Sequence, residues 1–144
     1  MHFKYNIDKA NNLVYVRFSD TVNDNALLRA FNSIYADPDY TPVMDQCLDY
    51  SDVEQLSLSH QGIQNLVTLC ENFNCLNTQW YTCIIAPDSL SYGYARMYQF
   101  LTKSSFEKVN VVRSQEAAMK LLSIKPDSSA YLAEKAKHKT LQVW

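Results

Sequence analysis

The 144-residue chain switches repeatedly between strand-like and helix-like apolar patterns, and this order constrains its fold more than any single motif. Residues 3–7 and 13–18 are predicted to form a β-hairpin, because the turn-rich segment 8–12 joins them. Further strands are predicted at residues 43–50, 79–86 and 109–112, and helices at residues 23–36, 59–74, 89–103 and 114–122. Strands that alternate with helices favour parallel pairing and right-handed crossovers. The order predicts one α/β domain, a hairpin followed by βαβαβα, with a mixed sheet of about five strands packed with helices and the first strand at its antiparallel edge.

The domain is expected to span residues 1–124, and residues 125–144 are expected to form a C-terminal helical extension. Pro126 interrupts the chain after the last core helix, and a lysine-bearing helix is predicted at residues 129–138. An apolar tip follows and ends in Trp144. An exposed tryptophan is costly, which favours docking of this tip on its own domain or on a neighbour.

Charge and glycine content exclude several classes of function. Charged residues make up 19% of the chain and the net charge is −2, so this is not a basic nucleic-acid-binding module. The only glycines, Gly62 and Gly93, are too far apart to form a glycine-rich phosphate-binding loop. The chain has neither a run of roughly 18 apolar residues nor an apolar signal core at its start. We therefore expect a cytoplasmic protein with no nucleic-acid partner and no membrane span.

The cysteines and histidines do not predict a metal site or an active site. There is no CxxC pair and no histidine at zinc-ligand spacing, so we expect buried, reduced thiols and no cofactor. The four thiols belong to Cys47, Cys70, Cys75 and Cys83. A Gly-x-Ser-x-Gly elbow is also missing. A partnership of Ser57 or Cys47 with His60 is the arrangement left open for nucleophilic catalysis. The expectation is a protein that is not an enzyme.

Three phrases carry a family resemblance. They are residues 36–40 (ADPDY), 49–53 (DYSDV) and 92–98 (YGYARMY). Over the first 122 residues these phrases make the chain similar to short, largely uncharacterised bacterial proteins described as anti-sigma-antagonist-like or CRAL-TRIO-like. The order of elements, with the segment 49–62 in its place, resembles the STAS domain, named after sulfate transporters and anti-sigma-factor antagonists. The resemblance implies a STAS-like fold and a regulatory or protein-interaction role. The alternative that it implies is a CRAL-TRIO-type carrier of a lipid or another small apolar ligand.

One position departs from the pattern of the anti-sigma antagonists. In those domains an aspartate-bearing strand leads to a turn of the type Asp-Ser-Ser-Gly-Leu, whereas residues 59–63 here read Ser-His-Gln-Gly-Ile. The serine just before the glycine is the one that a partner kinase phosphorylates in that family. Gln61 stands at this position and has no hydroxyl group. The usual phosphoserine switch is therefore not expected, although Ser57 and Ser59 place hydroxyl groups nearby.

The segment that leads into the second helix is the first candidate binding site. A helix start favours an anion or a phosphoryl group, and His60 can change its charge near neutral pH. The alternative is ordinary capping by Ser59 beside a surface histidine. The aspartates at the strand ends, such as Asp49 and Asp52, are a second candidate, with helix capping again as the alternative.

Tyr92 and Arg96 form a third candidate, because they are four residues apart on a predicted helix and point away from its apolar stripe. Exposed tyrosine and arginine are typical of binding hot spots, and the alternative is a stack within the helix. We expect either a protein partner or self-association as a homodimer. The predicted binding residues are Asp49, Tyr50, Ser57, Ser59, His60, Gln61, Tyr92 and Arg96.

Overall fold

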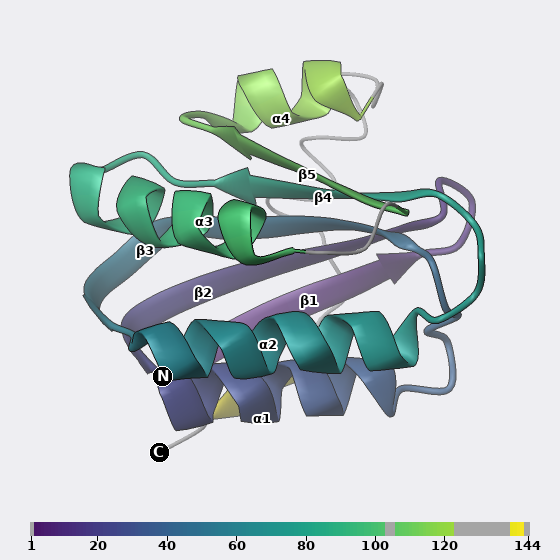
Figure 1. Ribbon diagram of the computed structural model, residues 1–144, viewed down its shortest axis with the longest axis horizontal. Coiled ribbons are helices and arrows are strands. Elements are labelled where there is room, and N and C mark those ends of the chain that lie inside the picture. The colour runs from purple at the N-terminus through teal and green to yellow at the C-terminus, as the bar shows by residue number, and fades with distance from the viewer. Residues whose placement is uncertain (1, 103–105, 123–138, 143–144) are drawn as a thin grey trace.

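The computed structural model describes residues 2–102, 106–122 and 139–142, which form one sheet with helices on both faces. The elements are β1 (His2–Asp8), β2 (Leu13–Asn23), α1 (Asp24–Tyr35), β3 (Asp45–Ser57), α2 (His60–Phe73), β4 (Trp80–Ile85), α3 (Ser89–Leu101), β5 (Glu107–Val112), α4 (Gln115–Leu121) and β6 (Lys139–Gln142). Helices α1, α2 and α3 lie on one face and run in the same direction, while α4 lies on the other (Figure 1). The three helices therefore all begin at the same end of the molecule.

The described strands are arranged in the order β5-β4-β3-β2-β1-β6. Pairing is parallel from β2 to β5, and β1 is antiparallel to both β2 and β6. The predicted α/β fold with a mixed sheet is confirmed. The prediction that the first strand lies at the edge is wrong, because β6 pairs with β1 from Lys139 to Gln142. Part of the predicted C-terminal extension thus docks on its own domain, and the helix predicted at residues 129–138 lies outside the described residues.

Strands β2 and β3 continue well beyond their predicted ends. The sequence patterns end them at Phe18 and Tyr50, but the structure carries them to Asn23 and Ser57. The added residues pair with each other in parallel, with register shifts between Arg17 and Ser19 and between Asp20 and Thr21. The sequence pattern does not predict this extension, because its side chains are mostly polar. Backbone hydrogen bonds form whatever the side chain is, so the strands continue. The predicted polar connection between the third strand and the second helix is therefore only two residues long.

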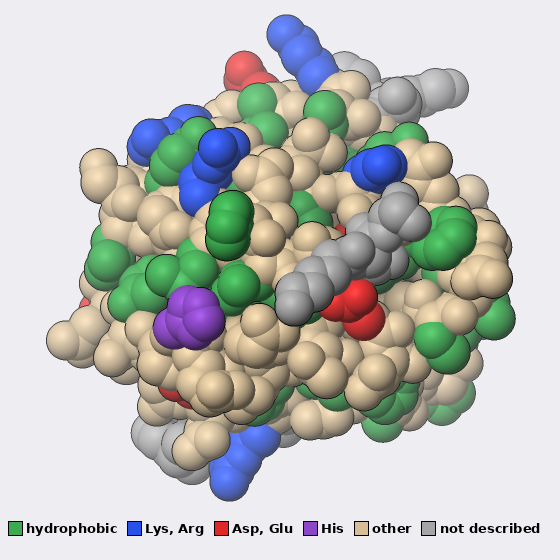
Figure 2. All heavy atoms as spheres, viewed as in Figure 1, with side chains coloured by type: hydrophobic (Ala, Val, Ile, Leu, Met, Phe, Trp, Pro, Cys, Tyr) green, Lys and Arg blue, Asp and Glu red, His purple; other side chains and the backbone are tan. Residues whose placement is uncertain are grey.

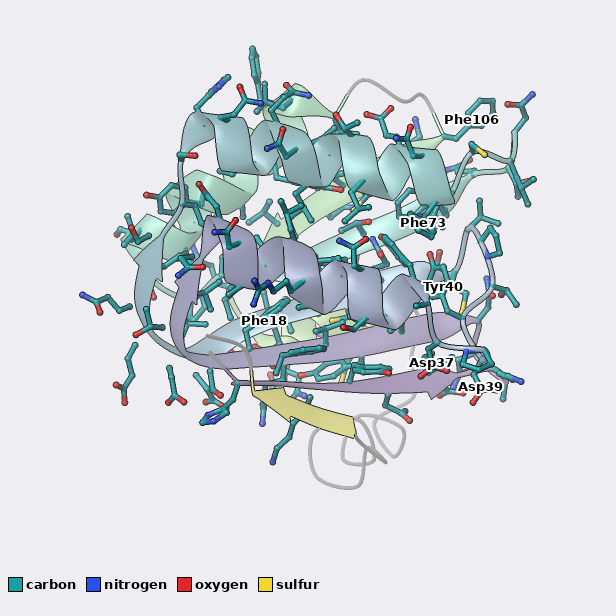
Figure 3. The ribbon with its side chains drawn as sticks, turned by 90° about the horizontal axis from the view of Figure 1, so that it is seen from below. Phe18, Asp37, Asp39, Tyr40, Phe73 and Phe106 are labelled. Carbon is teal, nitrogen blue, oxygen red and sulfur yellow. The ribbon has the colours of Figure 1, made fainter. Side chains whose placement is uncertain are left out.

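Two hydrophobic cores hold the helices on the sheet. The larger lies under α1, α2 and α3, where the ring of Phe18 stacks on that of Tyr50 with 4.8 Å between centroids. Figure 3 shows Phe18 between α1 and the strands. The smaller core lies under α4 and includes Tyr15 and Ala118. Three of the cysteines are buried as predicted, but Cys75 is exposed, which corrects the expectation of four buried thiols.

Aromatic rings close the larger core at the end of the molecule where α1 and α2 finish. The ring of Tyr35 lies 4.7 Å from that of Tyr40 and 4.9 Å from that of Phe73. Figure 3 shows Tyr40 and Phe73 near each other at this end. The hydroxyl of Tyr40 donates to Asn74 Oδ1 at 2.5 Å, so the loop after α1 is tied to the end of α2.

A line of buried polar side chains crosses the larger core. The hydroxyl of Tyr35 donates to Gln46 Oε1 at 2.7 Å, and Gln46 Nε2 donates to Thr82 Oγ1 at 3.1 Å. Thr82 Oγ1 and the hydroxyl of Tyr98 both donate to Glu107 Oε2, at 2.6 and 3.0 Å. Glu107 Oε1 is buried without a hydrogen-bond partner among the described residues. Burial raises the pKa of Glu107 to about 7.

This carboxyl group should make the stability of the fold depend on pH. The unfolded chain loses the Glu107 proton near pH 4.5 and the folded chain near pH 7, so the free energy of unfolding should fall as the pH rises between these values. The loss should reach up to about 3 kcal/mol. Urea denaturation at pH 5 and pH 8 measures this loss in the free energy of unfolding.

The variant Glu107→Gln should remove most of this decline, because the side chain can no longer ionise. The exposed Glu116→Gln on α4 is the matched control and should keep the decline of the parent protein. An equal pH dependence in the parent and in Glu107→Gln would contradict the assignment.

Candidate interaction face at the starts of α2 and α3

The start of α2 is already occupied by a carboxylate of the same chain. Ser59 is the N-cap, and its Oγ accepts a hydrogen bond from Gly62 N at 2.9 Å. The same hydroxyl donates to Asp24 Oδ2 at 2.6 Å, and Ser59 N donates to Asp24 Oδ1 at 3.0 Å. The negative charge that a helix start favours is thus supplied by the first residue of α1. The Ser59 hydroxyl is committed to the cap and to this carboxylate.

Gly62 is needed because Asp24 lies against it. A Cβ atom at this position would lie 2.0 Å from Asp24 Oδ1, which is far inside van der Waals contact. The requirement is therefore steric rather than conformational. Sequence reasoning found Gly62 through the family pattern, but Asp24 carried no signal because it precedes Ser59 by 35 residues.

The other predicted residues of this segment are at the surface. Ser57 ends β3, and His60 and Gln61 open α2, all three with exposed side chains. Gln61 Nε2 donates to Asn65 Oδ1 at 2.9 Å, one turn further along the helix. These three side chains border the end of the molecule where the helices begin.

Asp49 and Tyr50 lie on opposite faces of β3, so the structure does not bring them together. Asp49 is fully buried on the face that carries α4. Its Oδ1 accepts hydrogen bonds from the backbone N and the hydroxyl of Ser51, at 2.9 and 2.5 Å. Its Oδ2 accepts from the hydroxyl of Tyr15 and from Arg17, whose Nη2 is 3.3 Å away. With both oxygens occupied, Asp49 acts as an anchor for the middle of β3.

The polar side chains around Asp49 also hold neighbouring elements together. Burial, reinforced by the charge of Asp49, raises the pKa of the Tyr15 hydroxyl far above its usual range, so it remains a donor. Gln115 Nε2 at the start of α4 donates to the Tyr15 oxygen at 3.2 Å. Arg17 Nε also lies 3.5 Å from Asp52 Oδ2. The prediction that Asp49 and Asp52 stand at a strand end is wrong, because β3 continues to Ser57; the two aspartates share Arg17 within the strand.

Tyr50 points to the opposite side, where it lines a small cavity between β3, α2 and α3. The cavity has a volume of about 30 Å³, and its walls include Leu58, Ile63, Tyr94 and Ala95. A single water molecule needs roughly 10–15 Å³ on such a measure, so the cavity has room for the end of one apolar side chain. Figure 2 shows hydrophobic side chains gathered on this face, on the side where α2 and α3 begin.

The structure pairs Tyr92 with an arginine other than the predicted one. The guanidinium of Arg113 lies 4.0 Å from the centroid of the Tyr92 ring, and Arg113 Nη1 donates to the carbonyl of Pro87 at 3.3 Å. The contact between Tyr92 and Arg113 thus links α3 to the residue that follows β5. Arg96 is exposed on α3. Both residues belong to the helix that borders the cavity.

The pairing of Cys47 with His60 that was left open for nucleophilic catalysis does not assemble. Cys47 is buried in the smaller core under α4, whereas His60 is exposed at the start of α2 on the other face. Burial also raises the pKa of the Cys70 thiol to about 12, which keeps it protonated. In the described ranges, no three histidine, cysteine or acidic side chains are grouped as metal ligands would be. Nor does any helix in these ranges have the length and apolar character to cross a membrane.

Comparison with solved structures identifies the architecture. A crystal structure of an uncharacterised protein of the DUF3478 family from Shewanella loihica PV-4, described as having a SpoIIAA-like fold, matches with a TM-score of 0.53. The match covers 85% of this chain and 95% of that one, at 13% sequence identity. The chain has a SpoIIAA-like fold. The predicted STAS-like architecture is thereby confirmed, since the sporulation anti-anti-sigma factor belongs to the STAS domains. No family model and no curated protein matches the sequence.

The two glycines of this SpoIIAA-like fold should respond in opposite ways to alanine. Gly62→Ala displaces Asp24 from Ser59 and should lower the free energy of unfolding by about 1 kcal/mol. Gly93→Ala should raise it by about 0.5–1 kcal/mol, because a Cβ there meets no described atom within 4 Å and alanine favours the helix. Urea denaturation at low protein concentration measures both values. Equal changes in the two variants would contradict the steric role of Asp24.

Proposed function

We propose that this chain is a non-enzymatic regulatory domain that binds a protein partner, in the manner of the anti-sigma antagonists but without their phosphoserine. The observation that carries the proposal is the cavity between α2 and α3, which lies beside partly exposed apolar side chains. A cavity of this size suits one apolar side chain inserted by a partner. Anchors of that kind, seated in desolvated pockets, supply much of the binding energy of protein interfaces.

The composition of the two helices supports a protein partner. Apart from His60, α2 carries one charged residue, Glu71, and α3 carries one, Arg96. The cores of protein interfaces are depleted in charge and enriched in aromatic side chains. Tyr94 belongs to the wall of the cavity, and Leu90 at the start of α3 is 55% exposed. This face therefore has the composition of an interface core.

Two residues support the proposed lack of the family's phosphoserine switch. Gln61 has no hydroxyl group at the position of the family's serine. The Ser59 hydroxyl donates to Asp24, so a phosphate there would face a carboxylate at 2.6 Å. Partner binding in this protein is thus proposed to depend on the shape of the face. A cytoplasmic location is part of the proposal, and the free cysteines support it.

The cavity weighs against the carrier alternative. Pockets that enclose small-molecule ligands usually measure roughly 300–1,000 Å³, and a lipid chain requires a space of that order. The cavity between α2 and α3 is about 30 Å³. Its walls belong to the packed core, so enlarging it would separate α2 and α3 from the sheet.

Filling the cavity tests the proposed function. In Ala95→Val, two added methyl groups occupy the space, so a partner that inserts a side chain should be lost while the melting temperature changes by only a few degrees. The measurement is quantitative mass spectrometry of proteins recovered with tagged bait from an extract of the source cells. Ala117→Val, on α4 at the opposite face, is the matched control and should recover the same partner as the parent protein.

Two results would contradict the proposed function. One is the recovery of the same proteins by Ala95→Val and by the parent chain. The other is the recovery of no specific protein by the parent chain. An apolar small molecule that co-purifies, seen by native mass spectrometry, would favour the carrier instead.

A further inference from the structure

Two cysteines lie side by side in the sheet, on the face that carries α4. Cys47 of β3 is the register partner of Cys83 of β4, and these two strands are parallel neighbours. Both side chains are buried in the smaller core. The two thiols are hydrogen-bonded to each other, and the Cys47 thiol donates to the Cys83 sulfur. The fold therefore brings together two sulfurs that are distant in the chain.

The spacing of the two strands suits a disulfide bond. Neighbouring strands of a sheet lie about 4.7–4.9 Å apart. The Cα atoms of two cysteines joined by a disulfide are usually ~4.4–6.8 Å apart. Because Cys47 and Cys83 are in register and belong to the same core, a bond between their sulfurs requires no change in the register of the strands.

The two thiols differ in their chemistry. The hydrogen bond from Cys47 lowers the pKa of the Cys83 thiol, because it stabilises the thiolate. The same hydrogen bond, together with burial, raises the pKa of the Cys47 thiol. The thiolate is the nucleophilic form of cysteine. Within this pair, Cys83 is thus the nucleophile and Cys47 is the thiol that keeps its proton.

We propose that Cys47 and Cys83 are a redox-active pair, which hydrogen peroxide converts to a disulfide between β3 and β4. The Cys83 thiolate attacks one oxygen of the peroxide, the O–O bond breaks, and the hydroxide that leaves takes up a proton to become water. The Cys47 sulfur then attacks the sulfur of the sulfenic acid formed at Cys83. The S–O bond breaks, and the hydroxide leaves with the Cys47 proton as a second water. The two thiols have then lost two electrons and two protons, and the peroxide has been reduced to water.

The helix that covers the pair is short, and little of it is buried. Helix α4 has 7 residues, of which only Ala118 is buried. Gln115 Nε2 links the start of the helix to the Tyr15 oxygen at 3.2 Å. Elements with few buried apolar contacts open locally at a low cost in free energy. Local opening of α4 therefore gives a molecule as small as hydrogen peroxide a route to the two sulfurs.

Thiol labelling after peroxide treatment tests the proposal. The full chain carries Cys75→Ser, because an exposed thiol at this position links chains to one another on oxidation. The folded chain is treated with hydrogen peroxide, freed of the excess, unfolded and alkylated. Alkylation should then label Cys70 alone, and peptide mapping should show a bond between Cys47 and Cys83. Dithiothreitol should restore both thiols. Cys70 is the internal control, since it is buried in the larger core and its thiol stays protonated.

Two serine variants test the order of the steps. In Cys47→Ser, the sulfenic acid at Cys83 has no thiol to attack it, so dimedone should trap it there. In Cys83→Ser, the nucleophile is missing, so Cys47 should remain a thiol after the same treatment. Circular dichroism checks that both variants are folded. If either is not, the mapping in the chain with both cysteines still decides the proposal.

Three results would overturn the inference. They are a peroxide-treated chain in which Cys47 and Cys83 are still alkylated, a disulfide that includes Cys70, and a sulfenic acid trapped on Cys47 rather than on Cys83. The cysteine pair lies under α4, whereas the cavity lies on the opposite face of the sheet. The failure of this proposal therefore does not decide the proposed partner binding, which the Ala95→Val variant tests separately.

Discussion

The long parallel pairing of β2 with β3 is the constraint on which the candidate site depends. Both strands continue past the predicted ends, so they deliver the chain to the starts of α1 and α2 at the same end of the sheet. Asn23 at the end of β2 caps α1, and its side chain accepts a hydrogen bond from Ala26 N at 2.9 Å. Ser59, two residues after β3, caps α2. Asp24 then reaches Ser59 because the two helix starts are adjacent, and Gly62 provides the space for it.

Buried carboxylates lie on both faces of the sheet, in different electrostatic surroundings. Asp49 has donors on both oxygens, including a guanidinium group, so its charge is compensated where it is buried. Glu107 has two hydroxyl donors on one oxygen and no described partner for the other, and burial raises its pKa despite these donors. Glu107 joins β5 to α3 through Tyr98. The charged state of this carboxyl therefore bears on the packing of the helix that carries the cavity wall.

Helix α3 combines several roles because its sides face different surroundings. Tyr98 contacts the buried polar line, Ala95 and Tyr94 border the cavity, and Tyr92 receives the guanidinium of Arg113. Leu90 and Phe100 of the same helix are exposed, whereas Met97 packs half-buried against the larger core. A regulatory domain of the proposed kind can therefore bind a partner at the cavity while other sides of α3 hold the helix to the fold.

The sequence alone determined the order of elements, because apolar periodicity and capping residues are local properties. It also placed the caps Ser59 and Ser114 correctly. It could not show that the polar residues after Tyr50 continue β3, since backbone pairing leaves no side-chain pattern there, or that residues 139–142 pair with β1. The Asp24–Ser59 contact and the cavity beside Ala95 join residues distant in the chain, so only packing of the helices on the sheet decided them. Tertiary structure likewise separated Asp49 from Tyr50, because successive side chains of a strand point to opposite faces of the sheet.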